Sequence, residues 1–265
     1  MSIGIIGFGF VGRAIHNFFT KFDNIKVNIY DKYIEEYNNI NNIAEAEICY
    51  ISVPTLFEKD SYNYSAIYDV FEKLLEINYS NTILLKCTVE PDFTNKILYA
   101  KFPALVSSKL FYNPEFLSSQ TANYDFANQK HIIIGHNPNN NPDYIINFYK
   151  TYFPNAEISV ASIVEAESAK IFCNTFYAAK IQIFNEFYFA CQNNGANFDH
   201  VKNMMLKNGW INPMHTSVPG PDGLFSFGGA CFPKDIRGLN SYLKKIGSYN
   251  EVIEAVISES HIRNS

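Results

Sequence analysis

Short apolar runs alternate with helical patterns through the first half of the chain. Six runs fit buried strands, at residues 3–6, 26–30, 48–53, 82–89, 131–134 and 157–160. Apolar positions at helical spacing follow the first run through about residue 22 and recur at 66–75 and 144–152. This alternation of strands and helices predicts an α/β domain built on a doubly wound parallel sheet.

The pattern changes near residue 164. From there to about residue 193, apolar residues recur at helical spacing with no Gly or Pro, which predicts one long helix. More helical pattern follows, interrupted by a Gly- and Pro-rich loop at 212–229. We therefore expect an α/β domain over residues 1–162 and an all-α domain over residues 163–265, with the long helix at its centre.

Size and charge narrow the possible partners. The chain has 265 residues, of which 47% are hydrophobic, and this suffices for two modest cores. The formal net charge of -5 provides no strongly basic face, so we expect no nucleic-acid partner. An anionic substrate would need a local positive site instead.

The cysteines and the N-terminus indicate the cellular compartment of the protein. The chain has five cysteines, at Cys49, Cys87, Cys173, Cys191 and Cys231. This odd number and the lack of a C-x-x-C pair argue against a disulfide scaffold or a structural zinc site. The histidines show no metal-ligand spacing, so we expect no metal. No signal peptide precedes the first strand, and no apolar run reaches the ~20 residues that span a bilayer. We expect a cytoplasmic protein with no membrane partner.

A glycine-rich loop joins the first strand to the first helix. Residues 7–12 read GFGFVG, which is a G-x-G-x-x-G pattern. In this pattern Gly7 permits a tight turn, Gly9 lets a pyrophosphate approach the backbone, and Gly12 allows close packing of helix on strand. The helix N-terminus adds N–H groups and a partial positive charge for phosphates. The alternative is a glycine turn in an unrelated α/β protein.

An acid stands where a dinucleotide-binding fold needs one. Asp31 ends the second predicted strand, 19 positions after Gly12. A carboxylate there accepts hydrogen bonds from the adenine ribose hydroxyls and repels a 2′-phosphate. We therefore expect a Rossmann-type domain that binds NAD in preference to NADP, with Lys32 partly offsetting that preference.

One cysteine lies in a setting suited to chemistry. Residues 228–235 read GGACFPKD, so Cys231 follows two glycines and precedes Lys234 and Asp235. The glycines admit a substrate close to the backbone, and a nearby lysine lowers the pKa of a thiol. The alternative is a buried structural cysteine beside a turn. The local sequence leaves both interpretations open.

Further polar residues offer partners for such a thiol. Lys170 and Asn174 are four residues apart and share one helical face, where they could hold a developing oxyanion or form a solvated polar stripe. Glu115 lies in the apolar segment NPEFL, where burial would raise its pKa toward the range of a general base. It could equally cap a turn.

Taken together, these segments resemble the UDP-glucose/GDP-mannose dehydrogenase family from residue 3 to about residue 245. The matching segments are GFGFVG with Asp31, SVPT (52–55), CTVEP (87–91), NPEFL (113–117), AESAKIFCNTF (166–176), FNE (184–186) and VPGPDG with FGGACFPKD (218–235). Their order and spacing favour a reactive Cys231 over a structural one.

The resemblance implies a four-electron oxidation of a nucleotide sugar by NAD, foremost UDP-glucose to UDP-glucuronate. A primary alcohol becomes an aldehyde, Cys231 adds to it as a thiohemiacetal, and a second oxidation leaves a thioester that water hydrolyses. By position, Lys170 and Asn174 would hold the C6 oxygen. Glu115 would be the general base, while Thr88 and Asp235 would position the water.

The resemblance also implies binding residues. Those for the cofactor are Gly7, Gly9, Phe10, Val11, Gly12, Asp31, Val53, Pro54, Thr55 and Lys234. Those for the substrate are Phe116, Leu117, Phe227 and Gly228. The long helix is the dimer element of the family, so we expect a homodimer through residues of about 164–200.

The chain departs from the family pattern in three places. The family usually has a third domain that holds much of the UDP, and it would begin where this chain ends, which predicts a short form. An acid common after NPEFL is replaced by Ser119, and an Arg that reaches the sugar of the neighbouring subunit is replaced by Trp210. The departures leave the identity of the sugar open.

Two other functions remain possible. The first is a two-electron β-hydroxyacid dehydrogenase of related architecture, which needs no thiol, so the segment FGGACFPKD speaks against it. The second is a non-catalytic NAD-binding subunit of a larger partner. Retention of Cys231, Lys170, Asn174 and Asp235 counts against that role.

Overall fold

The structure is a computed structural model that describes residues 1–264. It divides into two compact units. The first unit comprises Met1–Glu58 and Tyr62–Lys170, and the second comprises Lys59–Ser61 and Ile171–Ser265. The division falls inside the long helix, directly after Lys170.

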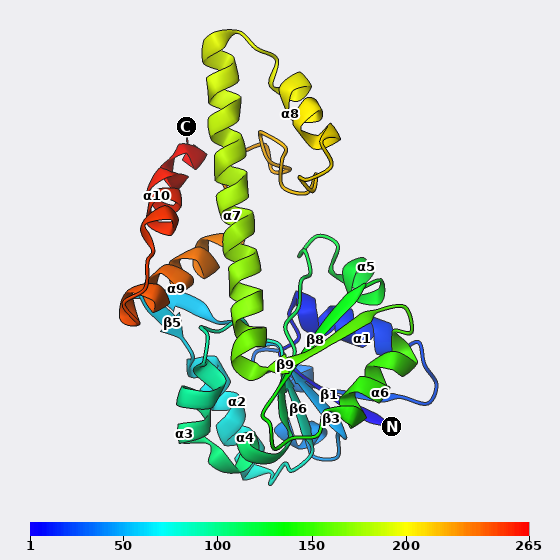
Figure 1. Cartoon of the computed structure of the whole chain (residues 1–265). Helices are drawn as coiled ribbons and strands as arrows, with labels where there is room; N and C mark the ends of the chain where they lie inside the picture. The colour runs from blue at the N-terminus through cyan, green and yellow to red at the C-terminus, as the bar shows by residue number, and fades with distance from the viewer. Residues whose placement is uncertain (265) are drawn as a thin grey trace. The chain divides into compact units, whose positions relative to one another are not determined.

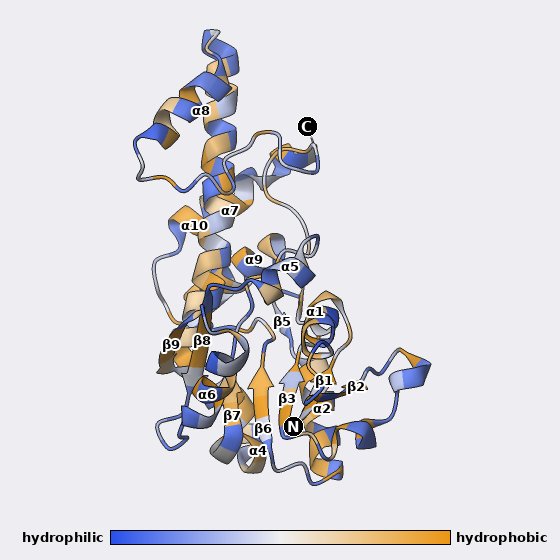
Figure 2. Cartoon of the chain, turned by 90° about the vertical axis from the view of Figure 1, so that its right-hand side faces the viewer, coloured by the Kyte–Doolittle hydropathy of each residue, from blue (hydrophilic) through white to orange (hydrophobic). Residues whose placement is uncertain are grey.

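A seven-stranded sheet forms the centre of the first unit (Figure 1). In chain order its strands are β1 Ser2–Ile6, β2 Lys26–Tyr30, β3 Ile48–Ile51, β6 Thr82–Leu85, β7 Leu110–Tyr112, β8 His131–His136 and β9 Glu157–Ser162. Their order across the sheet is β2-β1-β3-β6-β7-β8-β9. Strands β3 and β6 are buried at every position, because helices cover both faces. Figure 2 shows both strands in the hydrophobic colour.

The predicted doubly wound parallel sheet is observed, with one antiparallel pair of neighbouring strands. Strands β2, β1, β3, β6 and β7 are mutually parallel, and β8 is parallel to β9, but β7 and β8 are antiparallel. Between β7 and β8 the chain forms the six-residue helix α5 Ala122–Ala127.

Helices cover both faces of the sheet (Figure 1). On one face lie α1 Phe10–Phe19, α5 and α6 Asp143–Tyr152, where Phe18 contacts Phe126 and stacks on Phe153 with ring centroids 4.5 Å apart. On the other face Phe71 packs against Phe102. The helical segments there are α2 Ser65–Glu76, η3 Phe93–Leu98, α3 Tyr99–Lys101 and α4 Pro103–Lys109.

Smaller elements lie outside the main sheet. The 3-10 turns η1 Glu35–Tyr37 and η2 Ile40–Ile43 follow β2. Strands β4 Leu56–Glu58 and β5 Ser61–Asn63 form a separate two-stranded hairpin. The sequence did not predict this hairpin or β7, because strands of three residues are too short to establish an alternating pattern.

The second unit is helical, as predicted. Its main element is the part of α7 from Ile171 onward. The whole helix is Ile163–Asn194, close to the predicted 164–193, and Gly195 follows it with φ +76°, the left-handed conformation that ends many helices. The other helical segments are α8 Phe198–Lys207, α9 Phe232–Lys245, α10 Glu251–Glu259 and η4 Ser260–Asn264. An α/β sheet domain followed by a helical region with a long central helix confirms the predicted fold class. Within residues 1–264, no helix has the length and apolarity needed to cross a bilayer.

Candidate functional site

The candidate residues of the first unit lie in loops at one edge of the sheet. Gly7 follows β1, Asp31 follows β2, and Val53 lies just after β3. Thr88 follows β6, and Glu115 follows β7. Because these five strands are parallel, all the loops leave from their carboxyl ends, which is where α/β sheets bind ligands.

The glycine loop has the geometry that a pyrophosphate requires. A Cβ on Gly12 would lie 2.1 Å from the carbonyl oxygen of Gly7, so only glycine lets α1 begin so close to this turn. At Gly9, by contrast, no described atom outside its immediate chain neighbours lies within 4 Å of the Cβ position. Gly9 is the N-cap of α1, and no side chain among the described residues caps it. The first N–H groups of α1 therefore suit an anion.

Asp31 is held in a fixed orientation beside this loop. Its Oδ2 accepts a hydrogen bond from the Phe8 N–H at 2.7 Å, and its Oδ1 accepts one from the Tyr33 N–H at 2.9 Å. A pocket opens next to it between the loops after β1, β2 and β3 and one face of α2. The lining residues are Ile6, Gly7, Tyr30, Asp31, Lys32, Tyr33, Val53, Pro54, Ser65, Ala66, Asp69 and Val70. Apolar walls with one fixed carboxylate fit the adenosine half of a dinucleotide.

Thr55 joins two of the loops. Its side-chain Oγ1 donates a hydrogen bond to the Thr88 carbonyl oxygen at 2.7 Å. Thr55 is buried, so its hydroxyl fixes the loop after β3 against the loop after β6. This contact brings together the segments SVPT and CTVEP, which are far apart in the sequence.

Glu115 and Lys170 form a buried ion pair within the first unit. The Lys170 ammonium lies 3.2 Å from Glu115 Oε1 and also donates to the Glu115 carbonyl oxygen. The second carboxylate oxygen accepts the Leu117 N–H at 2.6 Å. The exposed fractions of Lys170 and Glu115 are 3% and 9%. Each charge is therefore compensated by the other, which a buried ion requires.

A second buried lysine, which was not predicted from the sequence, lies next to this pair. Lys86 Nζ donates to Asn113 Oδ1 at 2.7 Å and to the Asn113 carbonyl oxygen at 3.0 Å. Asn113 also accepts from the Tyr149 hydroxyl and donates to the Ile133 carbonyl oxygen. This network anchors the segment that carries Glu115. A polar residue directly after the buried run of β6 was the sequence signal for it.

In the second unit, two of the predicted residues contact the carboxylate of Asp235. Asn174 Nδ2 donates to Asp235 Oδ2 at 2.6 Å, and the Lys234 ammonium pairs with Asp235 Oδ1. Asp235 is fully buried, while Lys234 is partly exposed. Lys234, which the resemblance placed near the cofactor, is thus held by its neighbour in sequence.

Cys231 stands at the N-terminus of α9. It occupies the N-cap position, its thiol is partly exposed, and its carbonyl oxygen accepts the Asp235 N–H at 2.9 Å. Pro233 in the first turn fixes the start of the helix. A helix N-terminus stabilises a negative charge, which favours the thiolate form of a cysteine placed there.

The predicted substrate-binding residues have different surroundings. Phe116 is 42% exposed, and the Lys170 ammonium lies 4.9 Å from its ring centroid. Phe227, in contrast, is buried in the small core of the second unit with Ile236. A Cβ on Gly228 would clash with the Arg263 guanidinium, at 2.2 Å.

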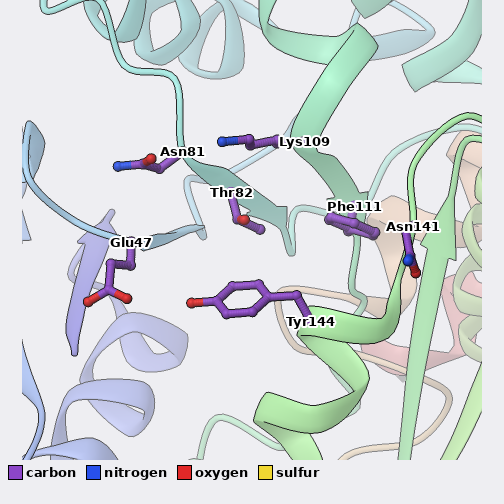
Figure 3. Close-up of a pocket in the computed structure, with 7 residues that line it drawn as sticks. All are labelled: Glu47, Asn81, Thr82, Lys109, Phe111, Asn141 and Tyr144. Atoms are coloured by element: carbon purple, nitrogen blue, oxygen red, sulfur yellow. The ribbon is translucent and has the colours of Figure 1, made fainter.

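Another pocket of the first unit lies at the opposite edge of the sheet (Figure 3). It is lined by Glu47, Asn81, Thr82, Lys109, Phe111, Asn141 and Tyr144. Glu47 precedes β3, Thr82 begins β6, and Lys109 precedes β7, so these residues mark the amino ends of the strands. Ligands of α/β sheets bind at the carboxyl ends, so this pocket is no candidate for the cofactor.

The fold and the loop geometry define the class: an α/β protein with a Rossmann-type dinucleotide-binding unit followed by a helical unit. Comparison with known families is more specific. Residues 24–153 match the "UDP-glucose/GDP-mannose dehydrogenase family, NAD binding domain", and residues 164–260 match the "central domain" of the same family. The chain belongs to this family, and NAD is the cofactor of its first unit.

Individual relatives agree with this assignment. The chain is 32% identical to the UDP-glucose 6-dehydrogenase of Rickettsia bellii over 88% of its own length and 53% of the relative. The chain thus spans about half the length of this curated relative. The UDP-glucose dehydrogenase structure from Pyrobaculum islandicum has a TM-score of 0.84 at 20% identity, covering 98% of this chain and 68% of the other. The 3-hydroxyisobutyrate dehydrogenase of Mycobacterium tuberculosis has a TM-score of 0.72 at 14% identity, covering 97% and 91%. At such identities, the two structures show the fold alone.

Proposed function

We propose that this chain carries the NAD-binding and oxidising parts of a nucleotide-sugar dehydrogenase, with UDP-glucose as the first candidate substrate and UDP-glucuronate as product. The observation that carries the proposal is Cys231 at the N-terminus of α9, in the unit that also holds Asn174 on Asp235. A two-electron alcohol dehydrogenase has no use for a thiol in this position. A four-electron oxidation needs one to retain the aldehyde.

The thiol turns one difficult oxidation into separate easier steps. Cys231 sulfur adds to the aldehyde carbon, and the carbonyl oxygen takes up a proton, which gives a thiohemiacetal. Loss of hydride and a proton leaves a thioester, and water releases the carboxylate and the free thiol. Two NAD molecules, bound in succession, would each accept one hydride, the first from the alcohol and the second from the thiohemiacetal. The glycine loop, Asp31 and Val53–Thr55 would hold each NAD in turn.

The remaining residues have roles that fit their contacts. The Lys170 ammonium and the Asn174 amide are donors one turn apart on α7, suited to an oxygen that gains negative charge. The Glu115 carboxylate would accept a proton from the attacking water. Its Oε1 lies 3.2 Å from the Lys170 ammonium. Thr88 and Asp235 would orient that water.

A second candidate is a two-electron hydroxyacid dehydrogenase. The resemblance in fold to the 3-hydroxyisobutyrate dehydrogenase of Mycobacterium tuberculosis, over most of both chains, favours keeping it as an alternative. It predicts a reaction that does not depend on Cys231. A non-catalytic NAD-binding subunit would bind NAD without turnover.

The stoichiometry of NADH formation distinguishes these functions. With UDP-glucose, the proposal predicts two NADH per sugar acid and a loss of acid formation of about a thousandfold in Cys231→Ala. Cys173→Ala is the matched control, because Cys173 is the other partly exposed thiol among the described residues. One NADH per turnover at a rate unchanged in Cys231→Ala would establish the second candidate instead. NAD binding without turnover of any nucleotide sugar would leave a binding subunit.

We also propose that the protein is a homodimer through α7. Phe172, Phe176, Ile183 and Phe187 are 49%, 65%, 45% and 37% exposed. At 100° per residue these positions fall within an arc of about 60°, so they form one apolar face of the helix. A second copy of the same face would cover it in a two-fold arrangement.

A further inference from the structure

The pocket beside Asp31, called the adenosine pocket below, is lined by three charged side chains. Only one of them is the acid that follows β2 in dinucleotide-binding folds. The three are Asp31, Lys32 and Asp69. Asp31 is fixed by two backbone N–H groups, whereas Asp69 comes from α2, on a different segment of the chain. The Lys32 ammonium lies 3.4 Å from Asp69 Oδ1.

Lys32 alone would work against selection for NAD. A cation directly after the ribose-binding acid is the kind of residue that accommodates the 2′-phosphate of NADP. In the structure this cation is paired with Asp69, and the pocket has two negative charges against one positive charge. Lys32 and Asp69 are 52% and 34% exposed, so the pair is weak in energy but remains accessible to a ligand.

The charges of Asp69 and Lys32 both act on the hydroxyl of Tyr30. Tyr30 also lines the pocket. Burial raises its pKa above the usual value, Asp69 raises it further, and Lys32 lowers it. The charges of Asp69 and Lys32 therefore reach the same point of the pocket wall.

We propose that Asp69 determines coenzyme specificity: it holds Lys32 away from a 2′-phosphate and adds a second negative charge that disfavours NADP. The inference rests on the NAD-binding part of the proposed function and concerns neither the sugar nor Cys231. It makes the coenzyme choice depend on a residue of α2 that the glycine fingerprint does not include.

Equilibrium binding of NADH and NADPH to the whole chain, followed by nicotinamide fluorescence, tests this inference. Asp69→Asn keeps the shape of the side chain and removes its charge. We expect the ratio of the NADPH affinity to the NADH affinity to rise about fivefold or more in this variant, and this gain to shrink as salt is added. Adding Lys32→Met to Asp69→Asn should abolish most of the gain.

Glu72→Gln is the matched control, because Glu72 also lies on α2 and pairs with Lys101 at 3.3 Å, yet does not line the pocket. It should leave the ratio of the two affinities at the wild-type value. An unchanged ratio in Asp69→Asn, or an equal shift in Glu72→Gln, would overturn the inference while NADH binding stands. Failure of the wild type to bind NADH would overturn the NAD-binding part of the proposed function, and this inference with it.

Discussion

Lys86 is a buried cation. Among the contacts of residues 1–264, no carboxylate lies within hydrogen-bond distance of its ammonium group. Its described hydrogen-bond partners are the two oxygens of Asn113. Burial lowers the pKa of Lys86 to about 7; Glu115 opposes this shift and Lys170 adds to it. The network under the Glu115 segment therefore has a charge that changes near neutral pH.

This pKa predicts how stability depends on pH. The unfolded chain keeps the Lys86 proton up to its ordinary pKa of 10.5, whereas the folded chain releases it near 7. Folding is therefore favoured as pH rises between these values. Relative to Lys86→Met, the wild type should gain about 2 kcal/mol in free energy of unfolding between pH 7 and pH 9. Urea denaturation at the two pH values measures this change.

Lys101→Met is the control, because Lys101 is exposed. Its difference from the wild type should be the same at both pH values. Parallel pH profiles for the wild type and Lys86→Met would contradict the assignment of the titration to Lys86.

At the scale of residues, the sequence offers candidates where a motif carries its own chemistry. It placed Gly7, Asp31 and Val53 at one site, and the structure gathers them around one pocket. It did not find Asp69 or Lys86, since their importance depends on what the fold brings next to them. It also gave Lys170 and Asn174 a shared role, but their present partners, Glu115 and Asp235, could not be derived from helical spacing.

Among the elements, β8 and the start of α7 meet at a close contact. A Cβ on Gly135 would lie 2.7 Å from Ala166 Cβ and 3.2 Å from the Ile163 Cα, and the Cα cannot move without shifting α7. Gly135→Ala should therefore lower the free energy of unfolding by about 1–3 kcal/mol. Chemical denaturation measures the loss.

Gly9→Ala is a matched glycine substitution, because it has no described neighbour within 4 Å beyond its own chain segment. It should unfold like the wild type while binding NAD more weakly. Equal stability of Gly135→Ala and the wild type would show that β8 and α7 are less closely packed than the structure indicates.

The accuracy of the element predictions followed the length of their patterns. The helix α7 repeats its apolar spacing over many turns and was predicted to within one residue at each end. Strand β7 has three residues, yet it places Asn113 and Glu115 at the carboxyl edge. Predicted strands 48–53 and 82–89 extended past the observed ends at Ile51 and Leu85, because the residues that follow turn into the site. Apolar character alone does not distinguish a strand from the loop that leaves it.

On the scale of the molecule, α7 connects two sets of candidate residues. Lys170 belongs to the first unit with Glu115, and Asn174 belongs to the second unit with Asp235 and Cys231. The helix is continuous between them, so the two donors keep a spacing of one turn. Whatever stabilises α7 as a helix also preserves this spacing. A second copy packed on its apolar face would do so.

The proposed dimer therefore predicts the effect of a charge on that face. Phe176, at 65% exposure, is its most exposed member, and in a two-fold dimer each substitution occurs twice. Phe176→Glu should raise the dissociation constant about a hundredfold or more, because it removes apolar contacts and buries two carboxylates. Sedimentation velocity at micromolar concentrations should show a dimeric wild type and a monomeric variant with unchanged helix content. Val252→Glu, at a 76% exposed apolar residue on α10, should remain dimeric. A monomeric wild type, or equal dissociation of both variants, would show that the α7 face is not the interface of a homodimer.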